Sequence, residues 1–454
     1  MLNTLAAPAR KVRSRVGAGE HLTPGAHASA LLDSLGLRHA QLPVDDRRDA
    51  AGLWADSGAM WLTGHAGGEC RHSPAPLAAC AQGAWLALAA LAPRQFDPSF
   101  DAHRLMGERA ACAGLERRGR MSAGGACRLL RSRDGWIALN LPREQDHELL
   151  PAWLGRPLDG PEDLAAAVGT RATRGLVARA RLLGLAVAPL REPPRARQAW
   201  YHATTIVARA VPPGPARRPL VLDLGALWAA PLCAQLLRQA GARVIKVEGS
   251  SRPDGARAGP RAFFDLLNAG KESVALDLHC DAGREQLRRL LLHADIVVES
   301  SRPRALEQMG LHAARFLADR PGMTWLGLSG YGRRAPNRDW IAYGDDAGVA
   351  AGLSWQVGGT GHDPVFCGDA IADPVTGIHA ALLALADWQA GGGRLVDISL
   401  HGVMRHIAAL GHGAPPPAPG TVARAPSARP SAATAAALGA DTQDILREFA
   451  RRGV

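Results

Sequence analysis

The chain has 454 residues and a globular composition, rich in Ala, Gly and Arg and poor in Phe and Tyr, which predicts two or three domains that each bury a core. Its formal charge of +11 comes from arginines scattered beside Leu and Ala, so we expect attraction of a small polyanion but no nucleic-acid partner. Its seven cysteines lack CxxC and Cys/His metal spacing, and no apolar run suits a secretory leader or a membrane span, which predicts a cytoplasmic protein with no metal and no membrane partner.

The first half of the chain is predicted to be helical around one small sheet. Residues 1–50 are weakly patterned, and we expect an N-terminal arm with a short helix over 27–36. The sequence "RSRDGW" between two apolar runs predicts a β-hairpin over 126–142 with its turn at 133–135. The other expected elements are an apolar helix over 76–92, two helices and a strand over 161–190, and a proline-rich linker over 208–218.

After this linker, apolar strands alternate with helices. We expect strands over 219–224, 243–248, 272–278, 295–300, 323–330 and 394–400, and helices over 228–241, 281–294, 311–322 and 373–385. Strands with nearly continuous apolar runs indicate a parallel sheet that is covered on both faces. A Pro/Ala-rich linker over 411–436 and a C-terminal helix within 437–454 complete the chain.

Two segments of the chain resemble each other without a gap. Residues 57–91 align with residues 351–385, and the shared positions include Gly58 with Gly352, Trp61 with Trp355, Gly64 with Gly358 and Gly83 with Gly377. In this alignment Asp373 falls on Ala79. The pattern predicts an internal repeat whose first copy keeps the shared glycine and tryptophan positions but has Ala79 where the second copy has Asp373.

The second copy contains "DPVTGIHAALLAL", in which Asp373 stands at the start of an apolar helix. Pro374 suits the first turn of a helix, because its missing N–H would have no partner there. Asp373 is therefore either an N-cap or a carboxylate that the positive end of the helix keeps ionised, and so able to act as a nucleophile. The two roles can coexist.

The glycines argue against a dinucleotide or ATP. The first turn of the predicted sheet reads "DLGALWAAP", without the GxGxxG that lets a pyrophosphate approach the backbone. No Walker A sequence occurs either. NAD and ATP are therefore not expected.

Several blocks in sequence order carry a family resemblance: "VLDLGALWAAPLCAQLLRQAGARVIKVE", "NAGKESVALDL", "VVESSRP", "DPVTGIHAALLAL" and "GRLVDISL". Together they resemble the family III CoA-transferases, which include formyl- and carnitine-CoA transferases and the α-methylacyl-CoA racemases. The implied fold class is α/β: a Rossmann-like parallel sheet domain over 219–410, preceded over 51–207 by a degenerate partial copy with a small α+β domain. This domain order is rearranged relative to the family.

The resemblance implies an acyl-CoA:carboxylate CoA-transferase in which Asp373 is the catalytic nucleophile. Its carboxylate would take the acyl group from sulfur and pass through an aspartyl-CoA thioester before coenzyme A moves to an acceptor acid. Amides near Gly330, Gly358 and Gly377 are the candidates for oxyanion support.

Residues that follow the predicted strands are the candidates for binding coenzyme A, because ligands of open α/β sheets bind at the carboxyl ends of the strands. These candidates are Arg252, Asn268, Lys271, Ser300 and Arg302. The family often has Asn where Ser300 stands and a basic residue where Gln308 stands. These departures keep a non-catalytic CoA-binding partner open as an alternative.

Racemase or isomerase chemistry on acyl-CoA is the second alternative. Racemases of this family carry a His-Asp pair where this chain has Tyr343 and Gly344. Moving a proton at the α-carbon needs two opposed acid–base groups, and only Asp373 can be named, so a transferase is preferred. The expected partners are an acyl-CoA and a carboxylic acid. The resemblance suggests a homodimer, or a monomer in which the altered domain order pairs the two halves internally.

Overall fold

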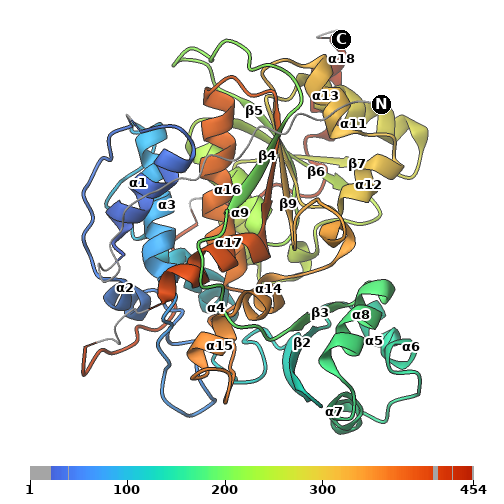
Figure 1. Cartoon of the computed structure of the whole chain (residues 1–454). Helices are drawn as coiled ribbons and strands as arrows, with labels where there is room; N and C mark the ends of the chain where they lie inside the picture. Colours follow the sequence, from blue (N-terminus) through green and yellow to red (C-terminus); the bar gives the residue numbers. More distant parts are fainter. Residues whose placement is uncertain (1–21, 39, 413–417, 432, 452–454) are drawn as a thin grey trace, which may run out of the picture.

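The computed structural model of the chain describes residues 22–38, 40–412, 418–431 and 433–451. Two sheets organise this part of the chain, one of three strands and one of seven (Figure 1). The first 21 residues of the predicted arm, residues 413–417 and 432 of the predicted linker, and the last three residues of the predicted C-terminal segment lie outside the described residues.

The seven-stranded sheet has the order β4-β10-β9-β8-β5-β6-β7, and all its strands are parallel except β4. Its strands are β4 (Tyr201–Thr205), β5 (Leu220–Leu224), β6 (Arg243–Gly249), β7 (Glu272–Leu276), β8 (Ile296–Glu299), β9 (Thr324–Ser329) and β10 (Arg394–Ser399). The six parallel strands confirm the prediction from the apolar runs. The seventh, β4, was not predicted: it precedes the predicted linker and closes one edge of the sheet.

Helices cover both faces of this sheet (Figure 1). One face packs against α9 (Ala229–Gln239), α16 (Ala372–Gln389) and α17 (Leu400–Ala408), and the other against α11 (Asp281–His293), α13 (Ala313–Asp319) and α18 (Thr442–Arg451). The smaller helices around the sheet are α10 (Arg261–Asn268), α12 (Pro303–Gln308), α14 (Gly344–Ala351) and α15 (Leu353–Val357). The apolar strands are thus buried on both sides, as their composition requires.

Helices from the first half of the chain extend the core on the α16 side of the sheet. These are α1 (Pro24–Ser34), α2 (Ala50–Asp56), α3 (Leu77–Leu91) and α4 (Glu108–Ala113). Helix α3 packs against both α1 and α16. A Cβ on Gly83 of α3 would lie 2.6 Å from the carbonyl oxygen of Pro24, and a Cβ on Gly377 of α16 would lie 2.8 Å from that of Ala229. Each glycine therefore lets the first residue of a neighbouring helix come close.

The three-stranded sheet forms a separate small layer with its own helices (Figure 1). Its strands are β1 (Cys127–Ser132), β2 (Gly135–Asn140) and β3 (Ala186–Pro189), and its helices are α5 (Glu144–Glu148), α6 (Leu150–Leu154), α7 (Pro161–Gly169) and α8 (Thr173–Leu183). Strands β1 and β2 pair antiparallel, with Ser132 opposite Gly135. The predicted hairpin and its turn are confirmed.

In the part of the chain that the structure covers, no helix is both long and apolar enough to cross a membrane. All seven cysteines are free thiols.

Candidate functional site

Asp373 is the second residue of α16, and its side chain is partly exposed. The prediction that it caps its own helix is wrong, because Ile371 holds the N-cap position and no side chain caps this end. The carboxylate instead accepts a hydrogen bond from the backbone N–H of Gly344, the first residue of α14. The starts of two helices therefore meet at Asp373.

Asp373 belongs to an acidic group that also contains Asp345, Asp346 and Asp369. Burial raises its pKa to about 7, Arg109 lowers it, and the neighbouring charges of Asp345 and Asp346 raise it further. Burial also raises the pKa of Asp346 to about 7 and raises that of Asp345. The expectation that the helix terminus alone would keep Asp373 ionised does not hold, because desolvation is the largest influence on this carboxyl and raises its pKa to about 7.

Two residues from the first half of the chain reach this acidic group. Arg109 of α4 donates from Nε to Asp369 Oδ2 at 2.8 Å, and its guanidinium carbon lies 5.7 Å from the ring centroid of Trp228. Asn140 of β2 donates to Asp346 Oδ1 at 2.9 Å. The site is therefore built from both halves of the chain. The sequence analysis missed Arg109 and Asn140.

Gly344 leaves room for the Asp373 carboxylate. A Cβ at this position would overlap both Asp373 Oδ2 and the carbonyl oxygen of Ala370. Any larger residue here would push α14 away from the start of α16.

The three glycines predicted to support an oxyanion make close backbone contacts. Gly377 packs α16 against α9, a Cβ on Gly358 would lie 2.7 Å from the carbonyl oxygen of Asp363, and one on Gly330 would lie 2.8 Å from the amide nitrogen of Ala342. These contacts account for the lack of a side chain at each position. Their role toward an oxyanion stays a prediction.

Asn268 and Lys271, predicted to bind coenzyme A, are buried. Lys271 Nζ bonds to Asp223 Oδ2 at 2.8 Å, to the carbonyl oxygen of Pro231 at 2.9 Å and to Asn268 Oδ1 at 3.1 Å. The Asn268 amide donates to the carbonyl oxygen of Phe264. An ammonium group has three donors, so all those of Lys271 are occupied. The structure contradicts a phosphate-binding role for both residues: they stabilise the core beneath β5.

The other three predicted residues lie at the carboxyl edge of the sheet. Arg252 follows β6 and is exposed, while Ser300 and Arg302 follow β8 and are partly exposed. Ser300 Oγ accepts a hydrogen bond from the backbone N–H of Ala226 at 3.1 Å, which ties β8 to the turn after β5. The order in which the chain adds strands to the sheet reverses between β5 and β8. Ligands of such folds usually bind in the crevice at this point.

Four arginines gather at this edge, and we call them the basic cluster: Arg143, Arg252, Arg302 and Arg304. Burial and the like charges of the other three lower the pKa of Arg302. Among the residues that the structure describes, no carboxylate forms an ion pair with Arg252 or Arg302. The sequence analysis did not single out Arg143 or Arg304.

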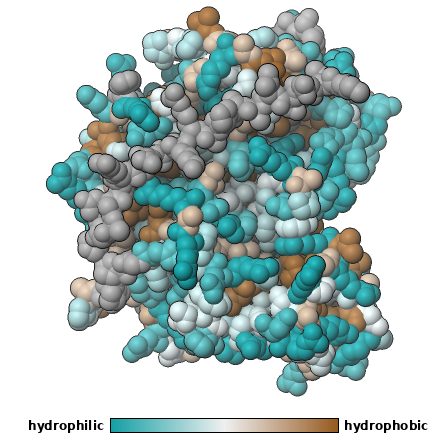
Figure 2. Space-filling view, in the orientation of Figure 1, coloured by the Kyte–Doolittle hydropathy of each residue, from teal (hydrophilic) through white to brown (hydrophobic). Residues whose placement is uncertain are grey.

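The basic cluster is linked to the Asp373 site through Tyr343. Arg143 stands with its guanidinium carbon 6.0 Å from the ring centroid of Tyr343, and Tyr343 directly precedes Gly344. Arg304 is part of α12, and Arg143 directly precedes α5. Between these two helices the surface is indented, where the part around the large sheet meets the small sheet (Figures 1 and 2). A polyanion bound there would lie beside the helix that contacts Asp373.

The described residues also hold one group with metal-ligand spacing, Asp56, Asp101 and His103. Arg104 contacts both carboxylates of this group, and His103 Nε2 donates to Asp56 Oδ2 at 2.8 Å. Positive charge already neutralises these acids, so ion pairing explains the cluster.

Comparison with known proteins gives matches to the second half of the chain. The model for CoA-transferase family III matches residues 219–437. Succinyl-CoA–D-citramalate CoA-transferase from Chloroflexus aurantiacus is 34% identical over 201 residues, covering 42% of this chain and 50% of the relative. (R)-2-hydroxy-4-methylpentanoate CoA-transferase from Clostridioides difficile is 31% identical over 208 residues, covering 42% and 51%. The chain thus spans about half the length of the curated relatives it matches.

Solved structures also match part of the chain. A CAIB/BAIF family protein from Brucella suis aligns with a TM-score of 0.37 and 28% identity, covering 42% of this chain and 54% of that protein. The segment matched by the family model includes Asp373, Arg252, Ser300 and Arg302.

Proposed function

Because residues 219–437 belong to CoA-transferase family III, we propose that this chain transfers coenzyme A from an acyl-CoA to a carboxylic acid through a covalent intermediate on Asp373. The observation that carries the proposal is the position of Asp373: a partly exposed carboxylate with a pKa near neutral, hydrogen-bonded to Gly344, whose chain neighbour Tyr343 faces Arg143 of the basic cluster. The relatives named above supply the reaction type.

The proposed reaction uses only carboxylates and one thiol. An ionised oxygen of Asp373 attacks the thioester carbonyl, the C–S bond breaks, and an acyl–aspartyl anhydride and the CoA thiolate result. The thiolate then attacks the aspartyl carbonyl and releases the first acid as its carboxylate. An acceptor carboxylate attacks the resulting aspartyl-CoA thioester, and the thiolate is freed again. It finally attacks the acceptor's carbonyl, which forms the new acyl-CoA and regenerates Asp373.

The near-neutral pKa suits this sequence of steps. Asp373 must be ionised to attack the thioester, and it is itself the leaving group only in the last step, when the thiolate attacks the acceptor's carbonyl. A carboxylate that burial has made more basic is a better nucleophile than an exposed one. The N–H of Gly344, which contacts the Asp373 carboxylate, is the nearest donor for charge that develops on its carbonyl oxygen.

We assign the phosphates of coenzyme A to the basic cluster, Arg143, Arg252, Arg302 and Arg304. Arginine matches phosphate oxygens with paired N–H donors, and mutual repulsion within the cluster would be relieved by an anion. Ser300 lies at the same edge of the sheet, where its hydroxyl contacts the backbone of Ala226.

A transferase is favoured over a racemase by the placement of the neighbouring acids. Asp346 is fully buried beneath Asn140, and Asp345 accepts a hydrogen bond from the backbone N–H of Ala370 at 2.9 Å. Neither carboxylate is free to face Asp373 across a substrate, which a two-base proton transfer requires.

The decisive experiment is intact-mass and peptide analysis after incubation with acyl-CoA and hydroxylamine. The proposal expects a hydroxamate on the peptide that contains Asp373, and no modification of an Asp373→Asn variant. Loss of α-deuterium from the acyl-CoA without an acceptor acid would instead support a racemase. A wild-type protein that binds acyl-CoA, but neither forms the adduct nor exchanges labelled CoA, would support the non-catalytic alternative.

We further propose that the first helices of the chain are a reduced copy of the second half, paired with it internally. Gly83 and Gly377, aligned in the sequence, make the same kind of contact with the start of a neighbouring helix, and α3 packs against α16 within one chain. A monomer is therefore expected. Light scattering that gives twice the mass of the chain would favour the homodimer.

A further inference from the structure

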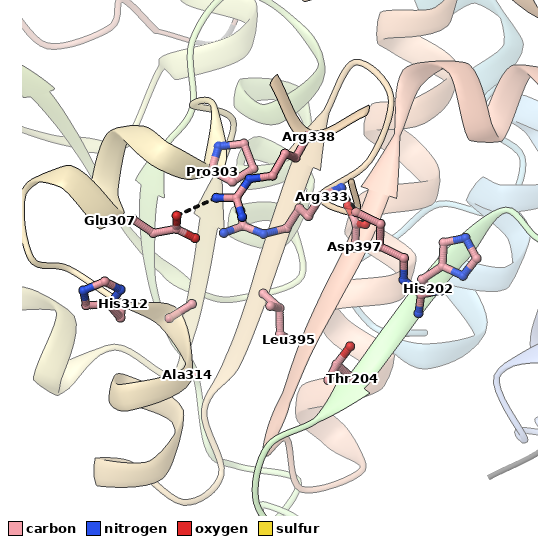
Figure 3. A pocket seen from close by; sticks show the side chains of 12 residues that line it. His202, Thr204, Pro303, Glu307, His312, Ala314, Arg333, Arg338, Leu395 and Asp397 are labelled. Atoms are coloured by element: carbon pink, nitrogen blue, oxygen red, sulfur yellow. Dashed lines mark hydrogen bonds and ion pairs between the residues drawn. The ribbon is translucent and has the colours of Figure 1, made fainter. Parts of the chain in front are cut away.

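A cavity of about 290 Å³ opens on the sheet face opposite α16. Its wall includes Leu395 and Asp397 of β10, whereas the alternate residues Val396 and Ile398 belong to the core that contains α16. The other walls come from α12, α13, β4 and the loop after β9 (Figure 3). None of its lining residues belongs to the basic cluster or to the acidic group around Asp373, although Pro303 of its wall stands between Arg302 and Arg304, so the cavity borders the basic cluster without sharing a residue with it.

The cavity contains an acidic side chain with an unused oxygen. Asp397 is only 8% exposed. Its Oδ2 accepts the backbone N–H of Arg333 at 2.9 Å, while its Oδ1 is buried without a hydrogen-bond partner. A buried carboxylate oxygen without a partner is costly. A donor from a bound molecule would satisfy it.

Three arginines lie along the same wall, and their pairing differs. Arg333 pairs with Glu299 at 2.9 Å, and Arg338 pairs with Glu307 at 2.5 Å. Arg334 is exposed, and no acidic residue in the described part of the chain forms an ion pair with it. Once the paired charges cancel, the Arg334 guanidinium and the Asp397 acceptor oxygen remain, together with the imidazoles of His202 and His312 and the Thr204 hydroxyl.

The remainder of the wall is less polar. Leu395 and Ala314 line the cavity below the arginines, with Thr204 on the β4 side (Figure 3). A short carbon skeleton could rest there while its polar groups face the arginines and Asp397. Burial raises the pKa of Asp397, and the charges of Arg333, His202 and Arg334 lower it, in keeping with cations gathered around this acid.

We propose that this cavity binds a small carboxylic acid that also carries a hydroxyl or amino group, with the carboxylate at Arg334 and the donor at Asp397 Oδ1. An anion would pair with Arg334 and a donor with Asp397 Oδ1, and a molecule that carries both groups would satisfy both. Leu395 and Ala314 favour a carbon skeleton over inorganic phosphate. The proposal does not depend on the chemistry at Asp373.

The test is calorimetric titration of the full chain with lactate, alanine, propionate and inorganic phosphate. Propionate has the same three-carbon acid without the donor. We expect lactate or alanine to bind at least about tenfold more tightly than propionate or phosphate, since a hydrogen bond to a charged group is worth that much. Equal affinity for propionate, tighter binding of phosphate, or no binding of any acid at millimolar concentration overturns the proposal.

Variants locate the binding. Arg334→Ala should weaken both lactate and propionate about tenfold, and Asp397→Asn should abolish the preference for lactate over propionate, because the amide presents a donor where Oδ1 accepted. Arg289→Ala, an exposed arginine on α11, is the matched control and should change neither. Asp373→Asn should leave binding intact. If Asp373→Asn removes the binding and Arg334→Ala does not, the acid binds at the other site and the inference is wrong.

Discussion

Gly344 is the position where a single methyl group should disable the Asp373 site. A Cβ there would overlap Asp373 Oδ2 and would lie 2.6 Å from the carbonyl carbon of Ala370. Non-bonded carbons pack at about 3.5–4.0 Å, so the start of α14 or of α16 must move by roughly 1 Å. Overpacking of this kind costs about 1–3 kcal/mol of stability. A displacement of about 1 Å can also slow a reaction roughly 100-fold.

Gly348→Ala is the matched control on the same helix. Its Cβ would meet Leu353 Cδ1 at 3.4 Å and Ile371 Cγ2 at 3.6 Å, which are ordinary contacts, and alanine favours a helix interior by about 0.5–1 kcal/mol. Urea unfolding measures both stabilities, and the rate of adduct formation on Asp373 in a single turnover measures the chemistry. A Gly344→Ala variant that matches the wild type in both measurements would refute the crowding described here.

Four further predictions concern charge. The rate of adduct formation should rise with pH through a midpoint near 7, because Asp373 must be ionised and burial raises its pKa. Asp346→Asn removes a neighbouring charge that raises this pKa, so the midpoint should move to lower pH; an unmoved midpoint contradicts the coupling. Arg302→Ala should raise KM for acyl-CoA about tenfold at unchanged kcat, whereas Arg289→Ala should alter neither constant, and equal KM values for the two variants exclude phosphate binding at Arg302. Lys271→Met should lower the free energy of unfolding by about 3–5 kcal/mol, since it leaves a buried carboxylate unpaired, and a raised KM with normal urea stability would restore Lys271 as a ligand.

The sequence predicted the parallel strands well because each is buried on both faces and therefore apolar throughout. Strand β4 lacks this signal. Its residues alternate weakly and are mostly exposed, and its partner β10 lies far away in the chain, with His202 opposite Asp397. An edge strand of this kind gains its structure from hydrogen bonds with a distant segment, which no local pattern reveals.

The sequence nominates candidate site residues only where a motif marks them. Asp373 and Arg302 stand in recognisable sequences at strand and helix ends, whereas Arg109 and Asn140 come from the first half of the chain and meet the acids only through tertiary packing. Lys271 shows the opposite error. A lysine after a loop resembles a phosphate ligand, and the sequence does not show that Asp223 of β5, two strands away in the sheet, forms an ion pair with it.

The antiparallel pairing of β4 with β10 makes the two halves of the chain hard to separate. If a protease cleaves the proline-rich stretch 208–218, the two fragments should stay associated, because β4 of the first fragment remains hydrogen-bonded to β10 of the second. Expression of residues 219–454 alone would remove β4 and leave the edge of β10 unpaired. It would also expose the face of α16 that packs against α3. Such a fragment should self-associate through its bare strand, so attempts to trim the protein to its recognisable half are expected to yield aggregates.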